Sequence, residues 1–299
     1  MRAAVMGSPI GHSLSPCLHR AAYQAMGLGG WTYEAFECDE ARLPGLLREL
    51  TPVRGQITGD AGQAGPAAGQ DPSDGDAWAG LSLTMPLKRA VLPLLDTVSD
   101  LAVEVGGANT VVFRDGLRHG HNTDVYGIEQ ALAEAGVPAP RSATVLGGGA
   151  TAASALAALR NLGLFSATLL VRDPARAGET VRVAERLGVA LAVGTMDKPD
   201  AMTGVDLVVS TLPGGAADAF AARLAGVPAL FDVVYSPWPT GAAAAVRAAG
   251  GTVVGGFAML VHQAVRQVEL MTGRTDVPVE AMRAAGEAEL LRRSASRTG

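Results

Sequence analysis

Between residues 124 and 255, short and wholly apolar runs alternate with longer segments of helical periodicity. A strand buried on both faces reads as a continuous apolar run, and parallel strands need helix-length connections. This alternation therefore predicts a mostly parallel sheet with helices on both faces, an α/β architecture. The expected strands are 143–146, 167–171, 191–193, 206–210, 229–233 and 252–254, and the expected helices are 124–135, 150–162 and 174–187.

The first of these strands runs into a glycine-rich turn. Residues 143–155 read ATVLGGGATAASA, in which Gly147, Gly149 and Ala152 form the pattern GxGxxA. The first glycine permits a tight turn, the second lets the backbone approach a pyrophosphate, and the small third residue lets helix and strand pack closely. The start of the following helix presents free amides and its positive dipole end to phosphates. In this context the motif favours a dinucleotide site over an ordinary turn, and it predicts a Rossmann-like doubly wound nucleotide domain.

The end of the next expected strand bears on which dinucleotide is bound. It reads LLVRDPAR, and its two basic residues are Arg172 and Arg176. An NAD site usually has an acid here against the ribose hydroxyls, whereas an NADP site has an arginine, which binds the 2′-phosphate bidentately. Asp173 lies between the two arginines, and we interpret it as the cap of the helix begun by Pro174. The segment favours NADP and leaves NAD as the alternative.

The rest of the chain alternates shorter elements. Ser15-Pro16 is a favourable helix cap followed by a proline, and Asp115-Gly116 predicts a hairpin turn. Residues 59–76 contain almost nothing that could be buried, so we expect a flexible surface insertion there. The expected strands are 2–7, 31–36, 81–83, 108–113 and 117–121, and the expected helices are 15–26, 41–50, 87–95, 259–271 and 279–291.

Composition excludes several classes of protein. With 24 Lys and Arg against 29 Asp and Glu, the net charge of -5 argues against a nucleic-acid partner. Cys17 and Cys38 are far apart and form no CxxC pair, which argues against a disulfide framework or a zinc knuckle and fits a reducing cytoplasm. The five histidines are scattered, so no metal site is expected. The start has no signal-peptide pattern and no apolar run approaches about 18 residues, so we expect neither export nor a membrane span.

Apart from the glycine motif and the strand end after it, the unusual residues are hydroxyls, amides and one potential ion pair, which suit a small polyol acid. They occur in six segments: GSPIGHSLSP (7–16), GLSLTMPLK (80–88), GGANT (106–110), GHNTDVYG (120–127), DVVYSPWPT (232–240) and GGFAMLVHQA (255–264). In these segments, which are spread over nearly the whole chain, the sequence resembles the shikimate dehydrogenase family. The resemblance implies reduction of the ring ketone of 3-dehydroshikimate by NADPH.

The resemblance also assigns roles to individual residues. It implies that Lys88 and Asp124 are catalytic, with the ammonium and carboxylate delivering a proton to the alkoxide that forms as hydride arrives. Ser82 stands where the family usually has Asn, which leaves the local hydrogen bonding open. The substrate-binding residues that it implies are Ser13, Ser15, Thr84, Asn109, Tyr235 and Gln263. The cofactor-binding residues expected from the glycine motif, the strand ends and the resemblance together are Gly147, Gly148, Gly149, Ala150, Arg172, Arg176, Thr211, Gly256 and Met259.

Several of these residues have plainer interpretations. A lysine near a helix start is ordinarily a solvated surface group, although the helix dipole disfavours it there. Asn122-Thr123-Asp124 before a helix is by itself a capping motif. Tyr235 could be a core tyrosine at a strand end, and a methionine on a helix, such as Met259, is usually core filler. The catalytic interpretation depends on folding that brings the Lys88 ammonium and the Asp124 carboxylate together.

The resemblance implies a discontinuous α/β substrate domain, formed by residues 1–123 and completed by 256–299, with the nucleotide domain at 124–255 between them. The active site would lie in the cleft where the two meet. A quinate or dual quinate/shikimate dehydrogenase that uses NAD, a non-catalytic sensor of a dinucleotide or ring acid, and a folate-type dehydrogenase of similar build remain alternatives. We expect a cytoplasmic enzyme of chorismate biosynthesis, monomeric or homodimeric, that binds a small molecule and neither nucleic acid nor membrane.

Overall fold

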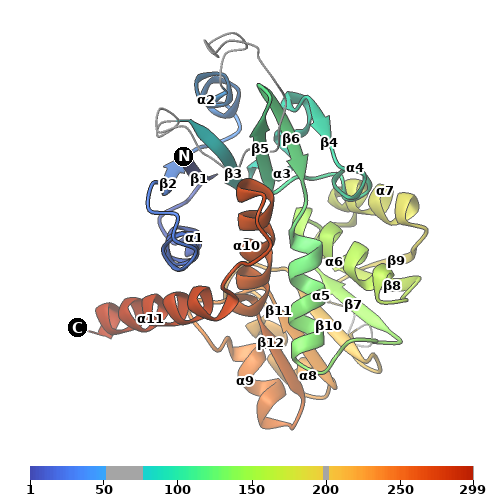
Figure 1. The fold of residues 1–299 in the computed structure, drawn as a ribbon. Coiled ribbons are helices and arrows are strands. Elements are labelled where there is room, and N and C mark those ends of the chain that lie inside the picture. Colours follow the sequence, from blue (N-terminus) through green and yellow to red (C-terminus); the bar gives the residue numbers. More distant parts are fainter. Residues whose placement is uncertain (52–76, 198–201, 299) are drawn as a thin grey trace, which may run out of the picture.

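The computed structural model describes residues 1–51, 77–197 and 202–298. The chain forms two six-stranded sheets, one mixed and one wholly parallel, with helices on both faces of each (Figure 1). This confirms the predicted α/β class and the Rossmann-like parallel sheet. The expected insertion at 59–76 lies outside the described residues.

The first sheet has the strand order β2-β1-β3-β5-β6-β4. Strand β1 pairs in parallel with β2 and β3, whereas β5 pairs antiparallel with β3 and β6. The hairpin between β5 and β6 turns at Asp115 and Gly116, both with positive φ (55° and 71°), as predicted for an Asp-Gly turn. The strand bounds are β1 Arg2–Gly7, β2 Thr32–Glu37, β3 Trp78–Leu83, β4 Thr97–Val98, β5 Thr110–Arg114 and β6 Leu117–His121.

Side chains of β1 alternate between two apolar cores, because successive residues of a strand point to opposite faces. Ala3 and Val5 pack with α1 (Ser15–Ala25), α10 (Gly256–Thr272) and α11 (Val279–Thr298). Ala4 and Met6 pack on the other side with α2 (Leu43–Leu50) and α3 (Leu87–Ala90). The two C-terminal helices therefore complete the half of the molecule that the N-terminus begins (Figure 1).

The second sheet has the order β12-β11-β10-β7-β8-β9, with every pair parallel. Its strands are β7 Ala143–Leu146, β8 Ser166–Val171, β9 Ala190–Thr195, β10 Leu207–Ser210, β11 Ala229–Asp232 and β12 Thr252–Gly255. Its helices are α5 Asp124–Glu134, α6 Ala150–Asn161, α7 Gly178–Leu187, α8 Ala221–Leu224 and α9 Gly241–Ala248. The order reverses direction at β7, so the glycine-rich turn after β7 lies at the point where such sheets bind ligands.

Two expected helices are divided, and three short ones were not expected. The segment 87–95 is helical only to Ala90 and continues as a 3₁₀ turn at Leu92–Leu94, because Pro93 has no amide hydrogen to continue the α-helix. The helix expected from Pro174 begins as a 3₁₀ turn, Pro174–Ala177, before α7. Helices α4 (Asp100–Val105), α8 and α9 were not predicted, because they are short or alanine-rich and lack a clear apolar period.

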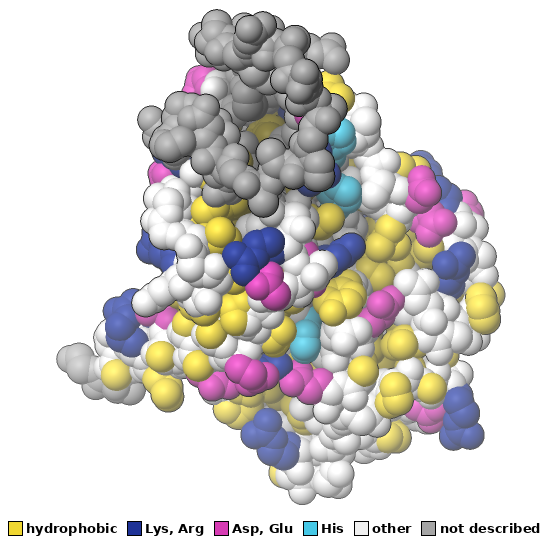
Figure 2. Space-filling view, in the orientation of Figure 1, with side chains coloured by type: hydrophobic (Ala, Val, Ile, Leu, Met, Phe, Trp, Pro, Cys, Tyr) yellow, Lys and Arg dark blue, Asp and Glu magenta, His cyan; other side chains and the backbone are white. Residues whose placement is uncertain are grey.

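On the face shown in Figure 2, basic and acidic side chains are interspersed with apolar and small ones, so the charge there is mixed rather than concentrated. Among the described residues, no helix combines the length and apolarity that crossing a membrane requires.

Candidate active site

A cavity of about 250 Å³ opens where the edges of the two sheets face each other, between β1, β3, α5 and α10. It gathers both predicted catalytic residues, all six predicted substrate-binding residues, and Gly256 and Met259. The remaining lining residues are Val5, Pro9, Ile10, His12, Ser82, Leu83, Thr151, Val233, Leu260 and Gln267. Residues as far apart in the chain as Val5 and Gln267 thus share one cavity.

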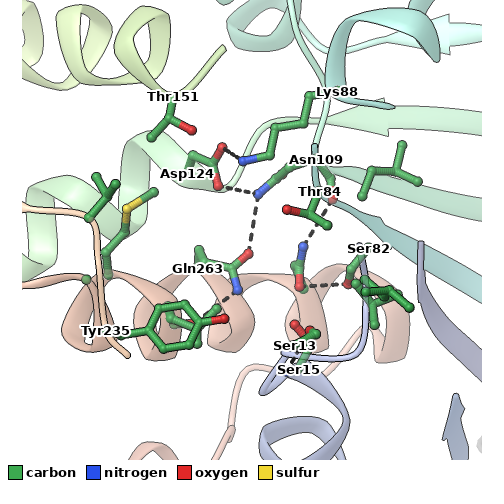
Figure 3. Close-up of a pocket in the computed structure, with 18 of the residues that line it drawn as sticks. Ser13, Ser15, Ser82, Thr84, Lys88, Asn109, Asp124, Thr151, Tyr235 and Gln263 are labelled. Carbon is green, nitrogen blue, oxygen red and sulfur yellow. Dashed lines mark hydrogen bonds and ion pairs between the residues drawn. The ribbon is translucent and has the colours of Figure 1, made fainter. Parts of the chain in front are cut away.

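Lys88 and Asp124 form an ion pair at one end of this cavity (Figure 3). Lys88 Nζ donates to Asp124 Oδ2 at 2.5 Å, and the two side chains are 14% and 3% exposed. Lys88 lies in the first turn of α3, and Asp124 is the first residue of α5. The expectation that folding joins these two groups is therefore confirmed, and Lys88 is not a solvated surface group.

Asn109, which directly precedes β5, anchors the pair. Its Nδ2 donates to Asp124 Oδ1 at 2.8 Å, while its Oδ1 accepts the backbone N–H of Thr123 at 2.8 Å. The two contacts fix the orientation of the amide and leave Lys88 the other oxygen of the carboxylate. The capping role suggested by the Asn-Thr-Asp sequence belongs to Asn122, whose Oδ1 accepts from the N–H of Val125 at 3.3 Å. Asp124 is thus free to face the cavity.

Close packing of α5 on α10 brings Gln263 beside Asn109 (Figure 1). A Cβ on Gly127 would lie 2.7 Å from the backbone oxygen of Met259, so only glycine allows the helices to approach this closely. Gln263 Oε1 then lies 3.3 Å from Asn109 Nδ2, and its Nε2 donates to the carbonyl of Leu260 at 3.0 Å.

Hydroxyl groups line the opposite end of the cavity, where Figure 3 shows Ser13, Ser15 and Tyr235. Helix α1 begins at Ser15 itself, after Leu14 in the cap position, so Ser15 is not the cap that the sequence suggested. Instead, the Oγ of Ser13 accepts the N–H of Ser15 at 3.2 Å. Tyr235 lies beyond the end of β11, and its hydroxyl donates to the carbonyl of His12 at 3.4 Å. Burial raises the pKa of the Tyr235 phenol, so it stays a neutral donor near pH 7.

Ser82, in place of the family's usual Asn, is fully satisfied in a buried network. The hydroxyl of Tyr33 donates to Ser82 Oγ at 2.6 Å, and Ser82 donates to Gln267 Oε1 at 2.8 Å. Gln267 Nε2 in turn donates to Thr110 Oγ1 at 3.0 Å. Burial raises the pKa of Tyr33, which keeps its hydroxyl protonated as a donor. The shorter side chain at position 82 therefore leaves no buried polar group unpaired here.

Three polar lining residues escaped the sequence analysis: His12, Thr151 and Gln267. His12 is part of the N-terminal motif, and Thr151 directly follows the glycine motif at the start of α6. Gln267 is buried and lies four residues after Gln263, on the same face of α10. That spacing of two glutamines on a largely apolar helix is the signal that could have identified it.

A groove of about 340 Å³ lies beside the glycine-rich turn and takes in Gly147, Gly148, Gly149, Arg172 and Thr211. Its other lining residues are Met85, Val171, Asp173, Met196, Leu212 and Pro213. The backbone of Gly147 has φ 100°, and a Cβ on this residue would lie 2.6 Å from the hydroxyl oxygen of Thr211. Glycine is required on both counts, as a dinucleotide turn demands.

The end of β8 supports the proposed assignment of its charged residues. Asp173 Oδ1 accepts the backbone N–H of Ala175 at 3.0 Å, so the interpretation of this carboxylate as a cap is confirmed. Arg172 is exposed in the groove. Ala150 begins α6 but lines neither cavity described above. The side chain of Arg176 lies outside the described part of the structure. The residues present therefore fit a dinucleotide with a phosphorylated ribose.

Met259 is 7% exposed and belongs to the apolar core around the parallel sheet, yet it also lines the first cavity. Met259 therefore packs in the core, as expected of a methionine on a helix, and its role beside the cofactor stays a prediction.

Comparisons with known proteins bear on the whole chain. Residues 5–59 and 70–111 match the family model described as "Shikimate dehydrogenase substrate binding domain", and residues 256–285 match "Shikimate 5'-dehydrogenase C-terminal domain". The "Shikimate dehydrogenase (NADP(+))" of Oleidesulfovibrio alaskensis is 34% identical over 283 residues, which cover 90% of this chain and 89% of that protein. The chain belongs to the shikimate dehydrogenase family. The resemblance seen in the sequence motifs is thereby confirmed.

Solved structures of the family superpose on nearly the entire chain. The shikimate dehydrogenase of Mycobacterium tuberculosis has a TM-score of 0.80 at 40% identity, with 96% of this chain and 99% of that chain covered. The enzyme of Thermus thermophilus, solved in complex with NADP(H) and shikimate, has a TM-score of 0.77 at 30% identity, with coverage of 96% and 99%. A 5-ketofructose reductase of Gluconobacter shares the fold alone, with 22% identity and a TM-score of 0.76. Fold by itself therefore does not determine the substrate.

Proposed function

We propose that this chain is an NADP-dependent shikimate dehydrogenase, which reversibly reduces 3-dehydroshikimate to shikimate in chorismate biosynthesis. The observation that carries the proposal is the Lys88–Asp124 ion pair, held inside a cavity lined by hydroxyl and amide groups. Membership of the family supports it, as do relatives named shikimate dehydrogenase (NADP(+)) that match about 90% of the chain.

In the proposed reaction, Lys88 provides the proton. As a ketone becomes an alcohol, negative charge develops on its oxygen, and a nearby ammonium can stabilise that charge and then donate. Asp124 orients the ammonium through the contact at 2.5 Å and offsets its positive charge. In the reverse direction the same amine accepts the proton of the substrate hydroxyl. NADPH, when bound, supplies the hydride.

Substrate orientation is assigned to the polar residues between the two ends of the cavity. Ser13, Ser15 and Tyr235 would hold the carboxylate, since their hydroxyls lie at the end remote from Lys88 (Figure 3). Asn109, Thr84 and Gln263 would bind the ring hydroxyls, since all three line the cavity (Figure 3). The separation of the two groups along the cavity matches a ring that carries its carboxylate and its ketone on different carbons.

Cofactor binding is assigned to the turn after β7 and the ends of β8 and β10, with the pyrophosphate over Gly147–Gly149 and Arg172 on the 2′-phosphate. Ala150, Arg176, Thr211, Gly256 and Met259 complete the proposed set. We further propose that residues 1–123 with 256–299 form the substrate domain and 124–255 the nucleotide domain, in a cytoplasmic monomer or homodimer. The packing of α10 and α11 on β1 supports this division.

The test is a set of four steady-state assays at 340 nm, with shikimate or quinate as substrate and NADP or NAD as cofactor. The proposal predicts the highest kcat/KM for shikimate with NADP. A preference for quinate with NAD would identify the quinate enzyme instead. Tight binding of shikimate in calorimetry without any absorbance change in the four assays would indicate a sensor and refute the catalytic role of Lys88.

A further inference from the structure

The last helix of the chain reaches back to the N-terminal motif. Near the end of α11, Arg293 donates from Nη1 to the carbonyl of His12 at 2.7 Å and from Nη2 to the carbonyl of Ser13 at 3.2 Å. Helix α11 packs along α1 (Figure 1), and this packing delivers the arginine to a segment 280 residues away. A bidentate contact to two successive carbonyls defines the position of that peptide.

The two carbonyls belong to the segment that presents the Ser13 hydroxyl to the cavity. The Tyr235 hydroxyl donates to the same His12 oxygen, at 3.4 Å. The positive charge of Arg293 also lowers the pKa of the Tyr235 phenol, although the opposite effect of burial is larger. The guanidinium and the phenol therefore interact electrostatically. Arg293 is therefore coupled to Ser13 and Tyr235, two of the three residues assigned to the substrate carboxylate.

Arg293 also borders open space. It lines a second cavity, which shares five lining residues with the first: Pro9, His12, Thr84, Val233 and Tyr235. Among the described residues that line this cavity, Arg293 is the only Arg or Lys, and none is Asp or Glu. Its side chain is 25% exposed, so its charge is only partly screened by water.

The nearby carboxylate does not cancel this charge. Glu289 pairs with Arg293 at 2.6 Å and with Arg292 at 2.7 Å, and these two arginines lower the pKa of Glu289 to about 2. Glu289 is therefore ionised near pH 7, and the cluster of two guanidinium groups and one carboxylate keeps a net charge of +1. Arg292 is 67% exposed, and its guanidinium pairs with Glu289 rather than with the N-terminal segment, so it offers a matched control.

We propose that Arg293 is a positioning residue for the carboxylate of the substrate. It holds the His12–Ser13 peptide so that the Ser13 hydroxyl faces the cavity, and it places a positive charge at the end of the site where the carboxylate binds. The inference rests on the proposed function, because it takes the hydroxyl-lined end of the cavity as the carboxylate subsite. It assigns a role to the C-terminal helix, which contributes none of the motif residues.

The test compares Arg293→Gln and Arg293→Lys with Arg292→Gln in the shikimate and NADP assay. We expect Arg293→Gln to raise KM for shikimate about fivefold to tenfold, the loss of roughly one charge-assisted hydrogen bond, with kcat and KM for NADP within about twofold of wild type. Arg293→Lys, which retains the charge, should have a KM for shikimate between those of wild type and Arg293→Gln. Arg292→Gln should have the KM of wild type. If Arg293→Gln does not fold, the lysine variant carries the comparison.

Shikimate methyl ester separates a role toward the carboxylate from general support of the fold. For a substrate without that charge, Arg293→Gln should reduce kcat/KM less than it does for shikimate. An equal loss on both substrates, or an equal effect of Arg292→Gln, overturns the inference. An inactive wild-type enzyme would instead refute the proposed function, so the two failures are distinguishable.

Discussion

Replacing Lys88 with methionine removes the ammonium but keeps an unbranched side chain of similar length, so it separates charge from packing. In wild type the Lys88 ammonium lies 2.5 Å from a carboxylate that is 3% exposed. In the variant, Asp124 retains the amide of Asn109 as a donor at 2.8 Å but has lost its cation. The substitution therefore leaves a buried and incompletely compensated charge.

The size of both effects follows from this geometry. Removal of one partner from a fully buried ion pair costs roughly 3–5 kcal/mol, and from an exposed pair less than about 1 kcal/mol. Since Lys88 is 14% exposed and Asn109 still donates, we expect Lys88→Met to lower the free energy of unfolding by about 2 kcal/mol. Loss of the proton donor should lower kcat by about 10²–10⁴.

The effect on stability and the effect on catalysis can be separated by comparing Lys88→Met with the double variant. Urea unfolding should show that adding Asp124→Asn to Lys88→Met recovers most of the lost stability, because no unpaired charge remains. Turnover of shikimate at 340 nm should stay low in both variants, while calorimetry should give a Kd for shikimate within about tenfold of wild type. A kcat for Lys88→Met within about tenfold of wild type would refute the assignment of Lys88 as proton donor.

Three further predictions concern other parts of the molecule. Gly127→Ala should lower the free energy of unfolding by about 1–3 kcal/mol in urea, because its Cβ would lie 2.7 Å from the Met259 carbonyl oxygen; unchanged stability would contradict the close packing of α5 and α10. Arg172→Gln should raise KM for NADPH about tenfold or more and leave KM for NADH nearly unchanged, and equal effects on both would show that Arg172 does not bind the 2′-phosphate. Burial lowers the pKa of His19 from 6.5 to about 4. Because the pKa of His19 is lower in the folded state than in the unfolded state, protonation favours unfolding. The free energy of unfolding should therefore be unaffected by this residue above about pH 6.5 and should fall by up to roughly 3 kcal/mol as the pH falls to about 4. The variant His19→Gln should lack this component of the pH dependence in urea unfolding, and an unchanged profile would assign it to other groups.

In the half of the molecule that contains the parallel sheet, the local sequence pattern predicted some helices and strands and missed others. Strand β7 and the start of α6 occur where the apolar run and the glycine motif predicted them, because the strand is buried on both faces and the turn requires glycine at Gly147. Helices α4, α8 and α9 left no comparable trace, since short or alanine-rich segments have no apolar period to read. Local sequence therefore determines an element when burial constrains every residue in it.

The candidate site depended on more than local pattern. Similarity of the motifs named the polar residues, but their meeting in one cavity is a property of the fold. The packing of α5 on α10 at Gly127 brings Asp124 beside Asn109, and the short helix α3 brings Lys88 to the same carboxylate. The network of Tyr33, Ser82 and Gln267 could not be read from the chain, because its members are up to 234 positions apart.

By itself, the sequence determined the α/β class, the parallel sheet, the glycine turn and the identities of most of the polar residues that line the cavity, because each of these is encoded in a periodicity or a contiguous motif. Only the tertiary structure decided that the hydroxyl of Tyr33 donates to Ser82 and that Asn122 rather than Asp124 caps α5. It also decided that Arg293 contacts the N-terminal motif. These contacts join segments through packing, or select one of several possible hydrogen-bond partners. Neither the distance between packed segments nor the choice among partners is recorded in the spacing of residues along a chain.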